Sequence, residues 1–303
     1  MISHITGSSL PFNFRILSHY CRRNTLRSFL WAQWLRFPSS FRCRVYRFLL
    51  AFSRTSSNSP YLQRLPLGLV YAKHGGSSVI QEALALQYVA DYTSIPVPEV
   101  LDLTQDKSLG PIMIISCVSG TPLSKKYSCL DELIPDKSTR IADVLRDWLN
   151  QLQYLQSPYG RLLCGYLGGA FSSYRISTQN FIGPYCSQNN FHDEPCCLLT
   201  PAHDANVRSL AAIIRQKRYD ISFVHGNVSP ENVLVDRDGV PIGLVGWECA
   251  AWMPNYWELT SGSWSVKGRS GECVWSHILV RCLPQYTDEL KVDRELWRTY
   301  NPY

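Results

Sequence analysis

Two neighbouring stretches decide the fold: His225-Gly226-Asn227-Val228-Ser229-Pro230-Glu231-Asn232 and, after a short turn, Leu244-Val245-Gly246-Trp247-Glu248. Apolar runs at 232–235 and 241–245 predict two short strands. Asp236-Arg237-Asp238-Gly239 lies between them and has the composition of a hairpin turn. The sequence therefore predicts a polar loop that leads into a β-hairpin.

The composition is that of a folded chain. Its 303 residues, 45% of them hydrophobic, are sufficient to bury the core of one large or two ordinary domains. Charged or polar residues interrupt every apolar run before about 18 residues, so we expect a soluble, cytoplasmic protein. The 11 cysteines include no C-x-x-C pair, and this argues against a zinc site or a disulfide framework.

The charge is uneven along the chain. Residues 1–64 hold ten arginines, and no acidic residue precedes Glu82. Three interpretations are open: a mitochondrial transit peptide, a surface for anionic lipid or nucleic acid through residues 1–54, or a basic lead-in that contains helices. We favour the lead-in, because several apolar residues lie at helical spacing. They are Leu26, Phe29, Leu30, Trp34 and Phe37.

Further segments follow from periodicity and from breaker residues. After a Ser-rich break at 53–60, a strand or hairpin is expected over 65–73, ending at Lys73, and helices are expected over 79–92 and 141–155. The run 165–201, rich in Gly, Ser and Asn, is expected to be an extended loop. The remaining expected elements are strands at 111–118 and 223–225 and helices at 207–217, 275–283 and 287–297.

Taken together, these segments resemble the aminoglycoside phosphotransferase-like branch of the protein-kinase-like fold, in particular its divergent fungal members. The landmarks that carry the resemblance, in chain order, are 64–69, 93–98, 119–123, the His225 motif, Trp247-Glu248 and 254–258. The resemblance implies an α+β fold of two lobes. It divides the chain into a basic lead-in at 1–64, a small sheet lobe with the hinge at 65–118, and a larger, mainly helical lobe at 119–303.

The resemblance also implies roles for individual residues. Lys73 and Glu82 would form the ion pair that holds the phosphates of ATP, and Asn232 would be a ligand of Mg²⁺. The backbone of Ser116, Cys117 and Val118 would be the hinge that meets adenine. The acceptor would be the hydroxyl group of an unidentified small molecule. We expect a monomer with no specific nucleic-acid partner.

Two departures from the family pattern concern the chemistry itself. The family's catalytic aspartate falls at Asn227, and its second, metal-holding aspartate falls at Gly246. An amide cannot accept the acceptor's proton as a carboxylate does, and glycine offers no ligand to Mg²⁺. We therefore expect a pseudokinase-like protein in which binding of ATP and Mg²⁺ is weak or lost.

The residues leave one catalytic alternative open. On an extended strand, residues 246 and 248 point to one face, so Glu248 can approach a metal beside Asn232 and support an active phosphotransferase with an altered metal site. His225 is expected to brace the loop rather than to act as a base. Leu67-Gly68-Leu69, with a single glycine, stands where a Gly-rich phosphate loop is expected and matches it poorly.

Overall fold

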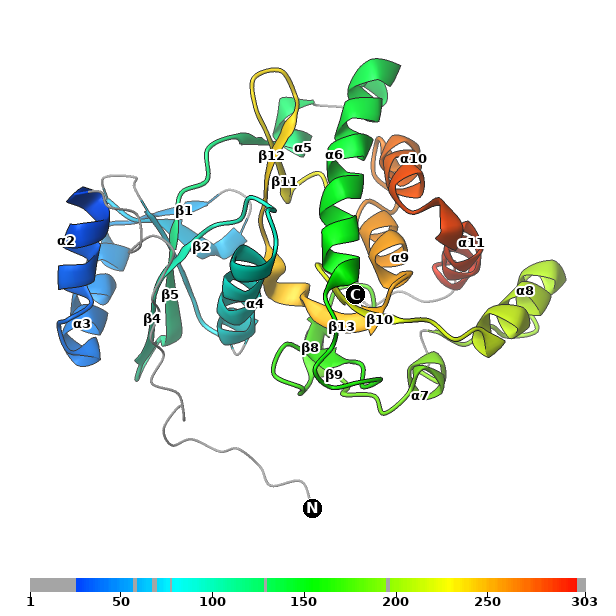
Figure 1. Cartoon of the computed structure of the whole chain (residues 1–303), viewed down its shortest axis with the longest axis horizontal. Coiled ribbons are helices and arrows are strands. Elements are labelled where there is room, and N and C mark those ends of the chain that lie inside the picture. The colour runs from blue at the N-terminus through cyan, green and yellow to red at the C-terminus, as the bar shows by residue number, and fades with distance from the viewer. Residues whose placement is uncertain are drawn as a thin grey trace.

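The computed structural model describes residues 26–56, 59–66, 70–76, 78–127, 130–194 and 197–298. Leu67-Gly68-Leu69 therefore lies outside the described residues. Figure 1 shows two lobes, a small one built on a β-sheet and a larger one built mainly of helices, as the family resemblance implies. None of the described helices has the length and apolar content needed to cross a membrane.

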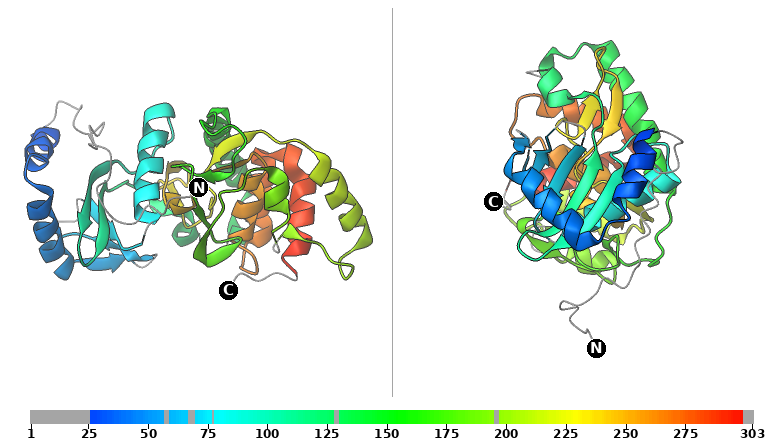
Figure 2. Two further views of the ribbon diagram at one scale, coloured as in Figure 1. Left: turned by 90° about the horizontal axis from the view of Figure 1, so that it is seen from below. Right: turned by 90° about the vertical axis from the view of Figure 1, so that its left-hand side faces the viewer.

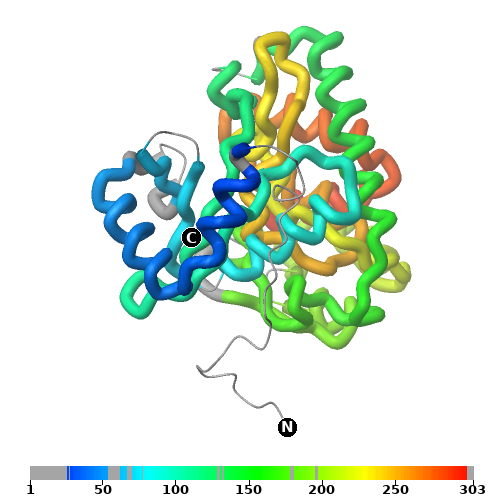
Figure 3. Tube along the Cα trace, turned by 60° about the vertical axis from the view of Figure 1, so that its left-hand side comes forward, coloured from blue at the N-terminus to red at the C-terminus, as the bar shows by residue number. Residues whose placement is uncertain are grey.

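The small lobe contains a five-stranded antiparallel sheet in the order β1-β2-β3-β5-β4. Helix α4 lies between this sheet and the large lobe, whereas α2 and α3 cover the opposite side (Figures 2 and 3). Strands β1 and β2 belong to the sheet, so the sheet begins within the Ser-rich segment that the sequence left as a break. The elements are α2 (Leu26–Trp34), α3 (Ser39–Ala51), β1 (Arg54–Ser56), β2 (Ser59–Arg64), β3 (Val70–His74), α4 (Ser78–Tyr92), β4 (Val100–Asp106) and β5 (Gly110–Ser116).

The large lobe is organised around the long helix α6. Its buried side chains recur at helical spacing, from Ile141 through Leu145 and Leu149 to Leu152, and they form part of the main hydrophobic core. Small sheets in the orders β12-β11-β6 and β10-β13-β7 complete this lobe. Its first elements are β6 (Thr121–Pro122), α5 (Leu123–Lys126), η1 (Leu130–Glu132), α6 (Pro135–Tyr154), β7 (Cys164–Gly165), β8 (Phe171–Ser173), β9 (Ser177–Ile182) and α7 (Gln188–His192). The remaining ones are α8 (Ala205–Gln216), β10 (Ile221–Val224), β11 (Val233–Val235), β12 (Pro241–Leu244), η3 (Trp247–Cys249), β13 (Ala251–Pro254), α9 (Trp257–Trp264), α10 (Glu272–Cys282), η4 (Pro284–Tyr286) and α11 (Thr287–Leu296).

Segment 165–201 differs from the extended loop that the sequence predicts. It contains the β8–β9 hairpin and helix α7, and Phe171, Tyr185 and Phe191 of this segment are buried in a second hydrophobic cluster. These short elements have no strong periodicity of their own. Burial of aromatic side chains against the rest of the lobe stabilises them.

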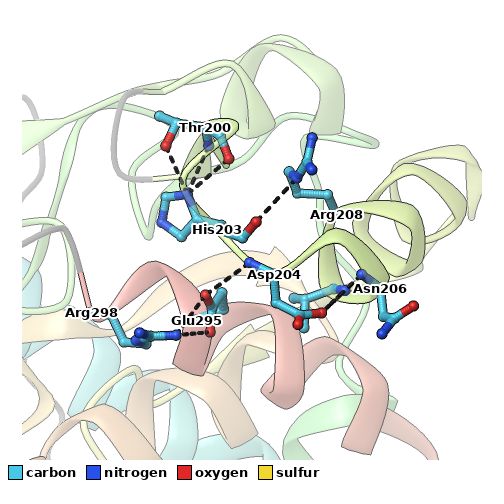
Figure 4. A network of polar contacts seen from close by, with 8 residues as sticks. Thr200, His203, Asp204, Asn206, Arg208, Glu295 and Arg298 are labelled. Carbon is cyan, nitrogen blue, oxygen red and sulfur yellow. Dashed lines mark hydrogen bonds and ion pairs between the residues drawn. The ribbon is translucent and has the colours of Figure 1, made fainter.

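Helix α8 begins where a side chain caps it. The Asp204 carboxylate accepts hydrogen bonds from the backbone N–H groups of Asn206 and Val207, at 2.8 and 3.1 Å. The backbone N–H of Asp204 in turn donates to the Glu295 carboxylate of α11 (Figure 4). The cap thus sets the start of α8 and holds it against α11.

Candidate functional site

A cleft of about 280 Å³ lies between the sheet of the small lobe and the β11–β12 hairpin of the large lobe. Tyr71 and Ile115 line it from the sheet, and Leu234 and Val245 line it from the hairpin segment. These side chains form two facing apolar walls. Such a space suits a flat, mainly apolar ring with polar groups at one end.

Lys73 lies in this cleft and binds two carboxylates. Its Nζ atom is 2.5 Å from Oε2 of Glu82 on α4 and 3.0 Å from Oε2 of Glu248 on η3. All three side chains are largely buried. One cation therefore faces two potential anions, and the group carries a net charge of about −1 when both carboxylates are ionised.

This arrangement shifts the pKa of each of the three groups. Burial lowers the pKa of Lys73, but Glu248 and Glu82 outweigh burial and raise it above its ordinary value. Burial raises the pKa of Glu82, and the neighbouring carboxylate adds to this against the opposing effect of Lys73. Burial also acts to raise the pKa of Glu248, but Lys73 holds it below its ordinary value. The lysine is therefore charged, and Glu248 is the more acidic of the two carboxyl groups.

The loop that begins at His225 is fixed by buried hydrogen bonds. The backbone N–H groups of His225 and Gly226 donate to the two carboxylate oxygens of Glu258 on α9, at 2.6 and 3.1 Å. The His225 ring lies between the carbonyl oxygen of Val245, 3.0 Å from Nε2, and the backbone N–H of Asn227, which donates to Nδ1. Burial lowers the pKa of His225 to about 4. A neutral ring that donates from Nε2 and accepts at Nδ1 satisfies both contacts and braces the loop.

Gly226 is required by the path of this loop. Its φ is +75°, and a Cβ atom would lie 2.5 Å from the carbonyl oxygen of Cys249. That oxygen belongs to the backbone and cannot move aside without moving η3. Only glycine fits at this position.

Asn227 and Asn232 are directly connected. The Asn232 side chain donates from Nδ2 to the carbonyl oxygen of Asn227, at 2.9 Å. The carbonyl oxygen of Asn232 accepts from the N–H of Val245, at 3.0 Å. Asn232 thus joins the loop to the hairpin and lines the cleft, while Asn227 itself is half-buried.

Gly246 lies beside Asn232 in a left-handed conformation, with φ +78° and ψ 54°. A Cβ atom at this position would be 2.6 Å from Oδ1 of Asn232. The chain then turns into η3, so the extended strand assumed for residues 246–248 is wrong. Glu248 reaches the cleft through this turn, and its Oε2 atom lies against Lys73.

The three residues expected to form the hinge are placed differently with respect to the cleft. Ser116 and Val118 line it, whereas the side chain of Cys117 is exposed. The Oγ atom of Ser116 accepts from the N–H of Glu99 at 2.8 Å, and the N–H of Ser116 donates to the Glu99 carbonyl at 2.9 Å. This pair of bonds fixes the hinge at the end of β5.

Several lining or neighbouring residues were missed by the sequence reasoning. Tyr71 lies two positions before Lys73 on β3, so strand alternation could have placed both on one face. Glu231 directly precedes Asn232 within the His225 motif, and this position could have placed it at the cleft. Tyr174, whose hydroxyl is 3.3 Å from Oε1 of Glu248, lies 74 positions away in sequence and gave no such signal.

Comparison with known families decides the assignment. A model described as the phosphotransferase enzyme family (APH) matches residues 75–274. The chain belongs to the phosphotransferase enzyme family. No curated protein matches its sequence.

Solved structures of aminoglycoside phosphotransferases share its fold. A complex of APH(2")-IIia with GDP and kanamycin is 12% identical, with a TM-score of 0.53, over 83% of this chain and 87% of that one. Aminoglycoside phosphotransferase APH(4)-Ia is 14% identical, with the same TM-score and coverages. A streptomycin–ATP complex of APH(2")-IIa is 10% identical, with a TM-score of 0.51, over 81% and 80%. The expected two-lobed, protein-kinase-like fold is thus confirmed.

For a member of the phosphotransferase enzyme family, the site has few groups that suit Mg²⁺, which prefers several carboxylate or carbonyl oxygens. The two carboxylates beside Lys73 are engaged by it, and Glu231 forms a 2.8 Å ion pair with Arg269. The described residues contain no group of three or more His, Cys, Asp or Glu side chains able to hold a metal ion. The donor set therefore fits a divalent metal poorly, although Asn232 offers one oxygen.

Proposed function

We propose that this member of the phosphotransferase enzyme family binds a nucleotide such as ATP and is impaired in phosphoryl transfer. The observation that carries the proposal is the contrast within one cleft. The apolar walls and a buried lysine are present, whereas neutral Asn227 and Gly246 stand at the positions of the family's two aspartates.

Nucleotide binding is supported by the shape and polarity of the cleft. The walls formed by Tyr71, Ile115, Leu234 and Val245 would hold a base, and Lys73 would meet the phosphates at the far end. Two of the structural relatives were solved in complex with a nucleotide, one with GDP and one with ATP. A phosphate must compete with Glu248 for Lys73, so the expected affinity is low.

Impaired transfer is supported by the chemistry of the polar residues. General-base assistance contributes typically about 10²–10⁴-fold in rate, and the amide of Asn227 cannot supply it. The competing function is active transfer to a small-molecule hydroxyl, with Glu248 as a metal ligand. The structure gives less support to this alternative, because Lys73 already holds the carboxylate of Glu248 at 3.0 Å.

Nucleotide binding is tested by thermal shift of the full-length chain titrated with ATP, with and without Mg²⁺. A ligand at about 100 times its Kd stabilises the folded state by about 2.7 kcal/mol. We expect an ATP-dependent rise in Tm that changes little with Mg²⁺. The Tm of Lys73→Ala with ATP is compared with the Tm of the same variant without ligand. We expect the ATP-dependent rise in Tm to be strongly reduced in this variant. The same rise in Lys73→Ala would contradict binding in this cleft.

Impaired transfer is tested by incubation with labelled ATP, Mg²⁺ or Mn²⁺, and a panel of amino alcohols and aminoglycosides. We expect no phosphorylated product above background. Product formation that is abolished by Lys73→Ala and by Glu248→Gln would establish the active alternative.

A further inference from the structure

Helices α2 and α3 lie on the side of the small lobe that faces away from the large lobe (Figure 2), and several of their apolar side chains are exposed. We call this surface the outer helical face. Its exposed apolar members are Leu26, Phe29, Leu30, Phe37, Phe41, Phe48 and Phe52. Positions 26, 29 and 30 share one side of α2, and positions 41, 48 and 52 share one side of α3 and its C-terminal end.

The orientation of these helices is fixed by contacts on their opposite side. The indole N–H of Trp31 donates to the carbonyl oxygen of Leu101, at 2.8 Å. The Tyr46 hydroxyl donates to the buried Asp102 carboxylate at 2.6 Å, and Arg42 forms an ion pair with the same carboxylate at 2.9 Å. Because the inner sides are anchored to β4, the outer helical face cannot turn inward without breaking these bonds.

Positive charge accompanies the exposed apolar groups. Arg44 lies one helical turn before Phe48 on α3; Arg44 and Arg47 are both exposed, as is Arg36 beside Phe37. Among the described residues, Arg47 has one acidic neighbour, Asp106, at 3.9 Å. The first acidic residue in the sequence is Glu82, so α2 and α3 contain none. The surface thus combines large apolar side chains with exposed arginines, of which Arg47 is partly compensated by Asp106.

We propose that the outer helical face docks on an anionic lipid bilayer, lying in the plane of its surface. Phe and Leu side chains would enter the boundary between headgroups and acyl chains, while the arginines would bind lipid phosphates and carboxylates. The proposal is independent of nucleotide binding, because no residue of this face lines the cleft.

Charge and apolar content together favour a bilayer over other partners. A nucleic acid would match the arginines but would leave the exposed parts of the seven large apolar side chains without apolar cover. A second copy of the chain would bring two basic faces together, and their like charges would repel. An anionic bilayer is complementary to both features.

The test measures co-sedimentation of the full-length chain with vesicles. Vesicles with about 30 mol% phosphatidylserine are compared with pure phosphatidylcholine vesicles at equal lipid concentration. We expect binding to the anionic vesicles that is about tenfold stronger or more, and that falls as the salt concentration rises, because screening shortens the reach of the arginines. Equal binding to both vesicles, or no binding at low salt, would overturn the proposal.

Two variants assign the binding to this surface. Phe48→Ser with Phe52→Ser removes apolar groups that are each 65% exposed, and Arg44→Glu inverts one charge. We expect each to weaken vesicle binding about tenfold without lowering the Tm. The matched control is Ile213→Ser on α8, which is 59% exposed and lies at the opposite end of the molecule. Its binding should equal that of the wild type.

Other outcomes would assign the surface differently. Loss of binding only when Arg15, Arg22 and Arg23 are neutralised would place the contact outside the outer helical face. Preferential binding of an oligonucleotide that depends on Arg44 but not on Phe48 would indicate a nucleic-acid surface. A dimer in solution that Phe48→Ser dissociates would indicate self-association. Each of these results would overturn the proposal.

Discussion

The Nζ atom of Lys73 lies 3.0 Å from Oε2 of Glu248, although the two residues are 175 positions apart in the chain. The contact joins β3 of the small lobe to η3 of the large lobe. Glu82 on α4 binds the same nitrogen at 2.5 Å. A lysine suited to bind phosphate is thus already neutralised by the protein, so an incoming phosphate must compete with two carboxylates for it.

Glu248→Gln should therefore strengthen nucleotide binding. Lys73 keeps a one-to-one pair with Glu82, and a repulsive charge near the incoming phosphates is removed. We expect ATP to bind several-fold to about tenfold more tightly, as measured by isothermal titration calorimetry.

Tyr174→Phe is the control for this substitution, because it removes the other side-chain partner of Glu248 while leaving Lys73 neutralised. Its ATP affinity should stay close to that of the wild type. An unchanged ATP affinity in Glu248→Gln would contradict competition between Glu248 and the phosphates for Lys73. A loss of Mg²⁺-dependent affinity would instead favour a metal-ligand role for Glu248.

Asn227→Asp combined with Gly246→Asp should confer metal-dependent ATP binding. The two aspartates would restore carboxylate oxygens beside Asn232, which hard cations prefer. The side chain at 246 must be accommodated at φ +78°, and the Asn232 side chain must turn away from a Cβ atom that would lie 2.6 Å from its Oδ1. We expect a loss of about 1–2 kcal/mol in unfolding free energy.

The measurement is thermal shift with ATP at increasing Mg²⁺. Gly246→Ala is the matched control, since it introduces the same backbone strain without a carboxylate. It should lose similar stability and gain no response to Mg²⁺. A double variant that also fails to respond would show that the cleft lacks further parts of a metal site.

Glu258 should give the protein a specific dependence of stability on pH. Burial raises the pKa of this carboxyl group from 4.5 to about 7, against the effect of the two N–H donors of His225 and Gly226. The folded state thus binds the proton more tightly than the unfolded state. Its contribution to stability is fully present below about pH 4.5 and is lost as the pH rises to about 7, with an upper limit of about 3 kcal/mol.

Glu258→Gln keeps an oxygen acceptor for the loop and removes this titration. The difference in unfolding free energy between wild type and variant should therefore change with pH between about 4.5 and 7, as measured by urea denaturation. His225, with its pKa lowered to about 4, has the opposite dependence and is present in both proteins, so its effect largely cancels. Parallel pH profiles would contradict the prediction.

Asp293→Ala should destabilise the large lobe by about 3–5 kcal/mol, because it leaves the buried Arg175 without its carboxylate. Nη2 of Arg175 is 2.6 Å from Oδ1 of Asp293, and the indole N–H of Trp297 donates to Oδ2 at 2.7 Å. Asp293→Asn, which keeps hydrogen-bonding capacity, should lose less. Arg175→Met with Asp293→Leu should recover most of the loss in denaturant unfolding. Equal stability of Asp293→Ala and wild type would show that the pair is not coupled to folding.

The sequence predicted those elements whose apolar residues repeat regularly. Helices α4 and α11 lie within a residue of the expected ranges. Helix α6 also ends within a residue of the expected position but begins six residues earlier, at Pro135. Helix α9 was not predicted, because its eight residues are all buried and therefore lack the contrast between an apolar and a polar side. The same limitation applies to β8 and β9, which depend on contacts with distant parts of the chain.

Site residues on adjacent elements could be predicted from the sequence. Those whose position depends on a turn of the backbone could not. Lys73 and Glu82 lie on adjacent elements, so their pairing could be expected. Glu248 was expected on an extended strand, but the left-handed backbone at Gly246 starts a tight turn. Strand alternation no longer applies past that residue. The contact of Glu248 with Lys73 could therefore be identified only from the structure.

The position of α2 and α3 has a consequence for how the molecule can be used. They cover the side of the sheet opposite to the one that faces the large lobe (Figure 2). Attachment through this end would leave the cleft between the lobes open to the surroundings. Anchoring and ligand exchange could then take place simultaneously, and a tethered molecule would sample ligands in the thin layer of solvent next to its support.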